Sequence, residues 1–196
     1  MELSLSQLPG DAAARLAEAA RSARHPMHTP VVGTADGDLR IMVLREARPD
    51  LSLLRFHTDL RSPKAAVIAE NPRVSVLAYD PEARLQLRMR GLGRIEPRGA
   101  VVDEAWNAAT LSSRRCYLAD HGPGTELPKP GSALPQDLLH RSPTIEESLP
   151  GREHFALLLV EVLVLDWLQL THEGGVRARF ERSSARADWQ GTWLAP

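Results

Sequence analysis

Ser62, Pro63 and Lys64 stand at the start of a short predicted helix, and their residue types suit the binding of a phosphate. Serine is a favoured N-cap and proline suits the first helical position, while Asn71-Pro72 predicts the end of the helix. A helix start offers unpaired backbone N–H groups and the positive end of the helix dipole. With a hydroxyl and a lysine in the same turn, the pattern favours an oxyanion site. A solvated helix start is the plainer alternative.

Two further cationic or polar motifs come just before that helix. Phe56-His57-Thr58-Asp59 ends a predicted strand, and an earlier predicted strand begins at Arg40 and ends at Arg45. A guanidinium group can bind two phosphate oxygens at once, whereas an isolated surface arginine only meets solvent. His57 is expected to line a site there, with an ordinary hydrogen-bonded histidine as the alternative.

Residues 84–91 alternate in the manner of a half-buried strand. Leu85, Leu87 and Met89 share one face, while the polar side chains, among them Gln86, share the other. A carboxamide can pair with a heterocycle edge that carries one N–H donor between two carbonyl acceptors. Gln86 is therefore a candidate contact for such a ring, and a solvent-facing residue is the alternative.

The other elements must position these residues. We expect an N-terminal helix within 1–28, best defined over 11–24 with Asp11 as its N-cap, and then an antiparallel meander. Further on we expect a helix over 101–118 and a long loop or lid over 120–150, rich in Pro, Gly and Ser. The predicted strands are 31–34, 39–45, 51–58, 74–79, 84–91, 155–170, 176–181 and 189–194.

With many strands and few crossover helices, the fold class is mostly β: an antiparallel β-barrel with flanking helices. The chain has 196 residues, which suits a single domain over 1–196. We expect no second domain.

Composition excludes several classes of function. Lys and Arg number 24 against 25 Asp and Glu, so no overall field attracts nucleic acid or an anionic membrane. The single cysteine, Cys116, allows no internal disulfide and fits a cytoplasmic setting. The longest apolar run, 155–170, is interrupted by polar residues and is too short for a membrane helix. The histidines show no regular ligand spacing, so no metal is predicted.

The order and spacing of these motifs resemble the pyridoxamine 5′-phosphate oxidase family of FMN-binding split barrels. The similarity is clearest over 39–91 and moderate over 155–196. The segments that carry it are Arg40-Ile-Met-Val-Leu-Arg45, Phe56-His57-Thr58-Asp59, Ser62-Pro63-Lys64, Asn71-Pro72-Arg73-Val74-Ser75, the strand Arg84 to Gly91, Asp166-Trp167-Leu168, Arg177-Ala178-Arg179-Phe180 and the terminal Leu194-Ala195-Pro196.

The resemblance implies an FMN site shared by two subunits of a homodimer. It implies that Arg40 and Lys64 bind the FMN phosphate, that the strand 41–45 lines the flavin, and that Gln86 contacts the polar edge of the ring. The second subunit is implied to complete the site. The full set that the resemblance assigns to FMN is Arg40, Ile41, Val43, Arg45, His57, Thr58, Ser62, Lys64 and Gln86, with Trp167 and Arg179 from the partner.

This chain departs from the family at the substrate signature. Where the oxidases place an Arg and a His that hold pyridoxamine phosphate, it has Gly175 and Arg177. The resemblance therefore implies an FMN-dependent oxidoreductase acting on a small molecule, and names neither the substrate nor the electron acceptor. The alternatives are a non-catalytic protein that stores or senses flavin, and a split barrel that binds haem or a deazaflavin.

Overall fold

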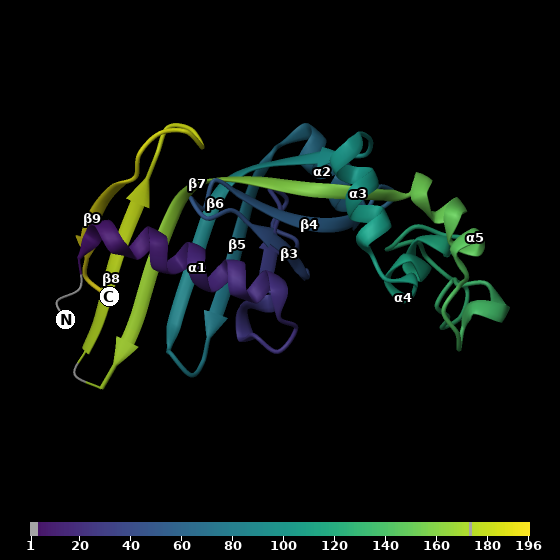
Figure 1. Cartoon of the computed structure of the whole chain (residues 1–196), viewed down its shortest axis with the longest axis horizontal. Coiled ribbons are helices and arrows are strands. Elements are labelled where there is room, and N and C mark those ends of the chain that lie inside the picture. The colour runs from purple at the N-terminus through teal and green to yellow at the C-terminus, as the bar shows by residue number, and fades with distance from the viewer. Residues whose placement is uncertain (1–3, 173) are drawn as a thin grey trace.

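A computed structural model describes residues 4–172 and 174–196, which form one curled antiparallel sheet with flanking helices (Figure 1). The strand order is β2-β1-β5-β6-β7-β4-β3, with β8 paired to β7 and β9 to β8. The strands are β1 (Val31–Gly33), β2 (Leu39–Ile41), β3 (Leu44–Ala47), β4 (Leu53–Asp59), β5 (Arg73–Asp80), β6 (Leu85–Glu96), β7 (Phe155–Thr171), β8 (Gly174–Glu181) and β9 (Gln190–Leu194).

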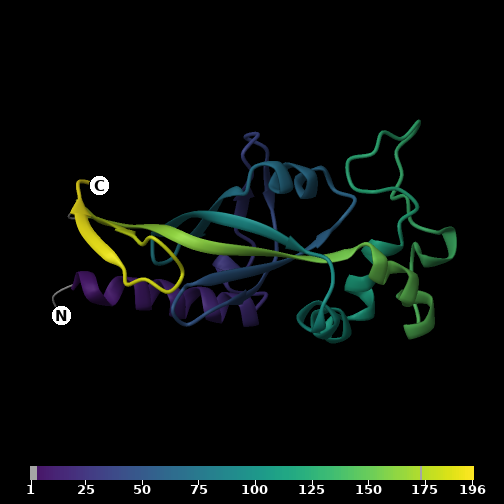
Figure 2. The ribbon, with the colours of Figure 1, turned by 90° about the horizontal axis from the view of Figure 1, so that it is seen from above.

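The long strand β7 explains why the barrel is split. Its first half pairs with β4 from Phe155 to Glu161, and its second half pairs with β8 from Val164 to Thr171. Strand β6 follows it along most of its length, with a register shift between Arg90 and Gly91. The sheet therefore curls at one end and extends as the β8–β9 hairpin at the other (Figures 1 and 2).

Helix α1 (Leu8–Arg21) packs against the sheet through small and apolar residues, among them Leu8, Ala12 and Leu16. It begins three residues earlier than expected, because Pro9 occupies its first turn. Asp11 is therefore not the N-cap. Its carboxylate instead accepts hydrogen bonds from Arg15 and from the indole of Trp167. Residues 1–3 of the predicted N-terminal segment lie outside the described residues.

Helix α2 (Pro63–Glu70) confirms the predicted helix, with Ser62 at the N-cap position. The helix expected over 101–118 is instead broken into α3 (Ala100–Ala108), α4 (Leu111–Arg114) and a 3-10 turn from Arg115 to Leu118. The break has a local cause: Ala109 is extended, and the Thr110 hydroxyl caps a new helix by accepting from Ser113 N.

The prediction of an antiparallel meander is wrong about which strands pair with one another. Strands β1 and β2 form one hairpin and β3 and β4 another, but β1 pairs with β5, and β4 pairs with β7. Local alternation identifies strands without naming their partners. No helix in the described part of the chain is long and apolar enough to cross a membrane.

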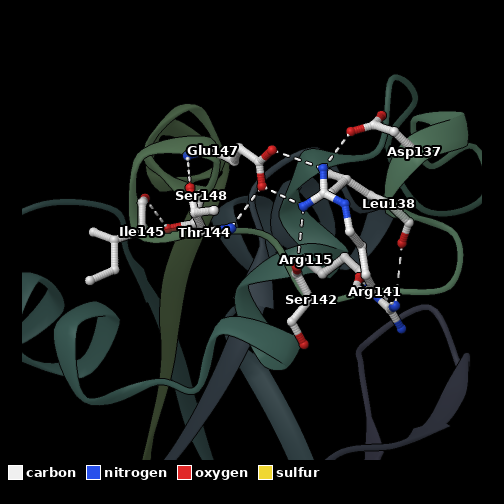
Figure 3. Close-up of polar contacts among 9 residues, drawn as sticks. All are labelled: Arg115, Asp137, Leu138, Arg141, Ser142, Thr144, Ile145, Glu147 and Ser148. Atoms are coloured by element: carbon white, nitrogen blue, oxygen red, sulfur yellow. Dashed lines mark hydrogen bonds and ion pairs between the residues drawn. The ribbon is translucent and has the colours of Figure 1, made fainter.

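Residues 111–153 form an insert beyond the start of β7, and α5 (Ile145–Ser148) is its last helix (Figure 1). Arg114 anchors the insert: its buried guanidinium donates to the carbonyls of Trp106 and Asn107 and to Ser148 Oγ. Figure 3 shows a second cluster, in which Arg141 binds Glu147 through two nitrogens at 2.6 and 2.8 Å.

The Glu147 carboxylate gives the insert an expected acid sensitivity. Its hydrogen bonds from Arg141, and then from Thr144 N, lower its pKa from 4.5 to about 2. A carboxyl group whose pKa is lowered on folding stabilises the folded state above its unfolded pKa, and that contribution is lost as pH falls toward 2. We expect the amide protection factors in 136–148, which are corrected for the pH dependence of intrinsic exchange, to fall between pH 4.5 and 2.

The control for this prediction is Glu147→Gln. The variant should exchange faster than the parent protein at neutral pH, and the acid-dependent difference between the two proteins should vanish near pH 2. Equal exchange of the parent and variant proteins at neutral pH would show that the Arg141 pair contributes nothing to the insert.

Candidate functional site

The predicted phosphate-binding residues gather around one hollow of about 360 Å³, which we call the Lys64 pocket. It lies where β2 and β3 meet the end of β4 and the start of α2. Seven of the residues expected from sequence line it: Arg40, Ile41, Val43, Arg45, His57, Thr58 and Lys64.

Lys64 is held at the start of α2 by Ser62. Its ammonium donates to Ser62 Oγ at 2.9 Å, and the buried Ser62 hydroxyl donates to the Asp59 carbonyl at 2.6 Å. Burial, and next the charge of Arg40, lower the pKa of Lys64. An anion between the two cations would relieve both effects, because it replaces lost hydration and screens their repulsion.

Arg40 is positioned by the turn between β1 and β2. It donates to Thr34 Oγ1 at 2.9 Å and forms an ion pair with Asp38. The nearby Asp59 carboxylate is occupied by Arg61, at 2.8 Å. The carboxylates of Asp38 and Asp59 are therefore already paired with arginines, and Lys64 and Arg45 are the cations of the pocket that form no ion pair among the described residues.

His57 lies in the wall of the pocket as a neutral imidazole. Burial, followed by the charges of Arg45 and Arg55, lowers its pKa to about 4. Its ring meets Phe155 edge-on, with centroids 4.8 Å apart. His57 can thus donate or accept a hydrogen bond at neutral pH without adding charge.

The insert supplies a wall that the sequence did not predict. Ser113, Cys116, Tyr117 and Pro123 line the Lys64 pocket. Tyr117 packs edge-on against Phe155 at 5.2 Å, and burial raises the pKa of its phenol. Ser113, Cys116 and Tyr117 fall in the segment expected as one helix over 101–118, and Pro123 falls in the expected loop, so only the tertiary structure shows that they reach the site.

Gln86 and Arg179 lie elsewhere, on the open face of the sheet. Arg179 lines a separate hollow of about 360 Å³ with Arg88, Arg90 and Arg177, and we call this surface the arginine face. Gln86 is on the same side of β6 as Arg88 and Arg90, since these positions alternate with the buried Leu85, Leu87 and Met89. Within one chain, neither residue joins Lys64.

Asp166 organises the arginine face. It accepts hydrogen bonds from Arg88 at 2.6 Å and from Arg177 at 2.8 and 3.1 Å. Burial opposes its ionisation, but the hydrogen bonds from Arg177 and Arg88 outweigh burial and lower its pKa. Arg177 is thus held by an acid on the neighbouring strand and does not simply face solvent.

Trp167 is the exception among the predicted site residues. It lies in register with Leu87 and Ala178 on the core side of the sheet, where it is 2 % exposed. Its indole N–H donates to Asp11 of α1 at 3.3 Å. Arg179 and Trp167 therefore point to opposite faces, and we leave Trp167 out of the site proposed below.

A sequence model described as the FMN-binding domain of pyridoxamine 5′-phosphate oxidase matches residues 14–96. That range contains the whole cluster of Arg40, Thr58, Ser62 and Lys64. No curated protein matches the chain.

Solved structures share the fold over most of the chain. A pyridoxamine 5′-phosphate oxidase-related, FMN binding protein from Nostoc punctiforme PCC 73102 has 22 % identity and a TM-score of 0.74, with all of both chains covered. PhzG from Burkholderia lata 383, solved with tetrahydrophenazine-1-carboxylic acid, has 18 % identity and a TM-score of 0.66, with 92 % of this chain and 87 % of PhzG covered. Residues 14–96 thus resemble the FMN-binding domain of pyridoxamine 5′-phosphate oxidase, and the whole chain has the split-barrel fold of these solved structures.

Proposed function

We propose that the chain is an FMN-dependent oxidoreductase and that the Lys64 pocket holds the FMN phosphate. The observation that carries the proposal is the half-buried Lys64 ammonium, placed beside Arg40 at the N-terminus of α2. Two cations, two hydroxyls and a helix start match the charge and the acceptor oxygens of a phosphate.

The remaining residues of the pocket fit the rest of the cofactor. Ile41 and Val43 offer apolar side chains along its wall, while Thr58 and Ser62 offer hydroxyls near Lys64. FMN supplies the redox chemistry when bound. The role of the chain is then to bind the phosphate, to orient the ring and to exclude water.

We propose that two copies pair through the arginine face. Within one chain Gln86 and Arg179 do not line the Lys64 pocket and stand instead on the open side of the sheet. Apolar side chains beside them are exposed, including Leu39 at 67 % and Ile41 at 71 %. Exposed apolar area of this kind favours association. Pairing would bring Gln86 and Arg179 of the second copy to the flavin.

The proposed partners are therefore a second copy and a small-molecule substrate, with no nucleic acid and no membrane. The balanced charge supports this choice, since a net charge of −1 provides no field for polyanions. We propose a cytoplasmic setting on the basis of the single cysteine.

The first test is the visible spectrum of the purified protein, followed by titration of the apoprotein with FMN and measurement of the particle mass. We expect a flavin spectrum, one FMN per subunit, and a dimer. A haem or deazaflavin spectrum would assign the pocket to another cofactor. Absence of uptake of all three cofactors would refute a redox role.

A non-catalytic flavin store or sensor is the second candidate. The insert residues that wall the Lys64 pocket, such as Ser113 and Tyr117, favour it because they restrict the space beside the cofactor. Anaerobic reduction of the bound flavin by reduced nicotinamides or amines, followed by reoxidation in air, would support the enzyme. A flavin that no such donor reduces would support the store or sensor.

A further inference from the structure

The insert packs against the start of α2 through residues 119–125, which we call the Gly122 loop. A Cβ atom at Gly122 would lie 2.6 Å from the Cβ of Arg61, and one at Gly124 would lie 3.5 Å from the ring of Pro63. These two contacts fall on either side of the N-cap of α2. The loop therefore lies directly against the helix start that we assign to the phosphate.

The Gly122 loop lies between two hollows. On one side Pro123, which stands between the two glycines, lines the Lys64 pocket. On the other side the loop borders a hollow of about 390 Å³, whose lining comes entirely from the insert, between residues 116 and 134. No strand of the barrel supports the loop from behind. The loop therefore has room to move away from the Lys64 pocket without disturbing the core.

Arg61 fastens the Gly122 loop to the barrel. Its guanidinium donates to the Ala119 carbonyl oxygen at 2.7 Å, which is the only hydrogen bond between residues 119–134 and the rest of the described chain. The Asp59 carboxylate accepts two further hydrogen bonds from the same guanidinium, at 2.8 and 3.1 Å, and the Asp59 side chain is only 8 % exposed. A pairing of this kind fixes the orientation of an arginine. Arg61 thus acts as a latch on the loop.

Asp59 also holds the groups that we assign to the phosphate. Its carboxylate fixes Arg61, while its carbonyl oxygen accepts from the Ser62 hydroxyl at 2.6 Å. Ser62 Oγ in turn accepts from Lys64 Nζ at 2.9 Å. The latch and the ammonium are therefore joined through one buried residue. Arg61 does not line the Lys64 pocket, so it is a positioning residue and not a contact of the ligand.

We propose that the Gly122 loop is a lid over the phosphate end of the Lys64 pocket, and that Arg61 is the positioning residue that keeps the lid closed. The lid then sets the rate at which a phosphorylated flavin enters and leaves, as closing loops do at many ligand sites. The inference rests on the proposed function for the flavin, while closure over a phosphate group does not depend on it. A flavin without a phosphate does not reach Lys64 and Ser62, so the lid does not retain it.

The test compares the binding kinetics of FMN with those of riboflavin, which lacks the phosphate. Release of labelled flavin is measured by a chase with unlabelled flavin, and association is measured in stopped flow by the quenching of flavin fluorescence. Arg61→Gln should raise both the association rate and the release rate of FMN by about tenfold, the effect of one charge-assisted hydrogen bond. Because both rates rise together, the Kd of FMN should change little. Both riboflavin rates should stay unchanged.

Gly122→Ala opens the lid in a second way, because the added Cβ atom collides with Arg61. It should accelerate FMN exchange as Arg61→Gln does, and it keeps the test open if Arg61→Gln does not fold. Two matched controls should leave every rate unchanged. Gly131→Ala adds the same methyl group elsewhere in the insert, where the nearest atom lies 3.9 Å away. Arg15→Gln breaks another arginine–aspartate pair, in α1.

Unchanged FMN rates in Arg61→Gln and Gly122→Ala would overturn the inference. Equal acceleration of FMN and riboflavin would also overturn it, because it would mean that the substitutions only disturb the pocket. Faster release of FMN without faster association would have the same meaning. Normal FMN affinity with any of these results refutes the lid alone and leaves the proposed function standing.

If the protein binds no FMN, or no riboflavin for comparison, amide exchange of residues 119–125 is measured with and without inorganic phosphate. Slower exchange with phosphate in the parent protein, but not in Lys64→Ala or Arg61→Gln, would support the lid. In a protein that binds no FMN, this result would refute the proposed cofactor alone. Exchange that phosphate does not slow in the parent protein would refute the lid.

Discussion

Lys64→Ala is expected to weaken FMN binding by about 1.5 to 3 kcal/mol, which corresponds to roughly a tenfold to 150-fold higher Kd. The ammonium is half-buried, fixed by Ser62 and close to Arg40, so its loss removes a charge-assisted contact with the phosphate. Titration of apoprotein by the quenching of flavin fluorescence measures the change. Lys64→Arg should recover part of the loss.

Arg40→Ala should weaken FMN binding by a similar amount, since Thr34 and Asp38 hold its guanidinium toward the same pocket. In the double variant the two losses of FMN binding energy should not add fully, because the substitution of Arg40 also removes its electrostatic repulsion of Lys64. Arg48→Ala is the matched control and should leave the Kd unchanged. Unchanged FMN affinity in both Lys64→Ala and Arg40→Ala would refute the assignment of the FMN phosphate to the Lys64 pocket.

The phosphate side of the site could be predicted because its residues are local in sequence. Thr58, Ser62 and Lys64 lie within one strand end and one helix start, and the chemistry of a helix N-terminus is visible in the residue types. Ser62 was expected as an N-cap, and it occupies that position. Its hydroxyl, however, bonds to Asp59 and Lys64 in place of the helix backbone.

The remainder of the site depends on pairing that local sequence does not encode. The strand 84–91 alternates as predicted, but only the register with β7 shows that Arg88 meets Asp166. The same register sends Trp167 to the core beside α1. A one-residue difference in position along β7 thus separates a residue of the arginine face from a residue of the core.

The insert could not be predicted for a different reason. It is held by single arginines, not by a periodic apolar face: Arg114 joins α3 to Ser148, and Arg115 donates to the carbonyls of Leu138 and Arg141. Such contacts leave no repeating pattern in the sequence. The insert nevertheless supplies the wall of the Lys64 pocket, so its stability and the geometry of the site are linked.

Gly91→Ala is expected to have the largest effect on stability. A Cβ atom at this position would lie 1.7 Å from the Glu161 carbonyl oxygen and 2.8 Å from its carbonyl carbon. The obstacle is backbone on both sides, so no side chain can move aside. We expect a loss of more than about 4 kcal/mol in the free energy of unfolding, measured by urea denaturation.

Gly10→Ala provides the matched control. Nothing lies within 4 Å of a Cβ atom there, and the residue is in the first turns of α1, where alanine is preferred over glycine. The same substitution should therefore leave stability unchanged or raise it by up to about 1 kcal/mol. If Gly91→Ala is insoluble, its yield of folded protein after refolding from urea, compared with that of Gly10→Ala, gives the second readout.

The large loss of stability expected for Gly91→Ala follows from the position of this residue in the fold. Strand β6 shifts register here, opposite the residues where β7 exchanges β4 for β8 as its neighbour. The two backbones can approach at this point only because residue 91 has no side chain. A stable Gly91→Ala protein would mean that the strands can separate without cost where the barrel splits. The split would then not depend on this close backbone approach.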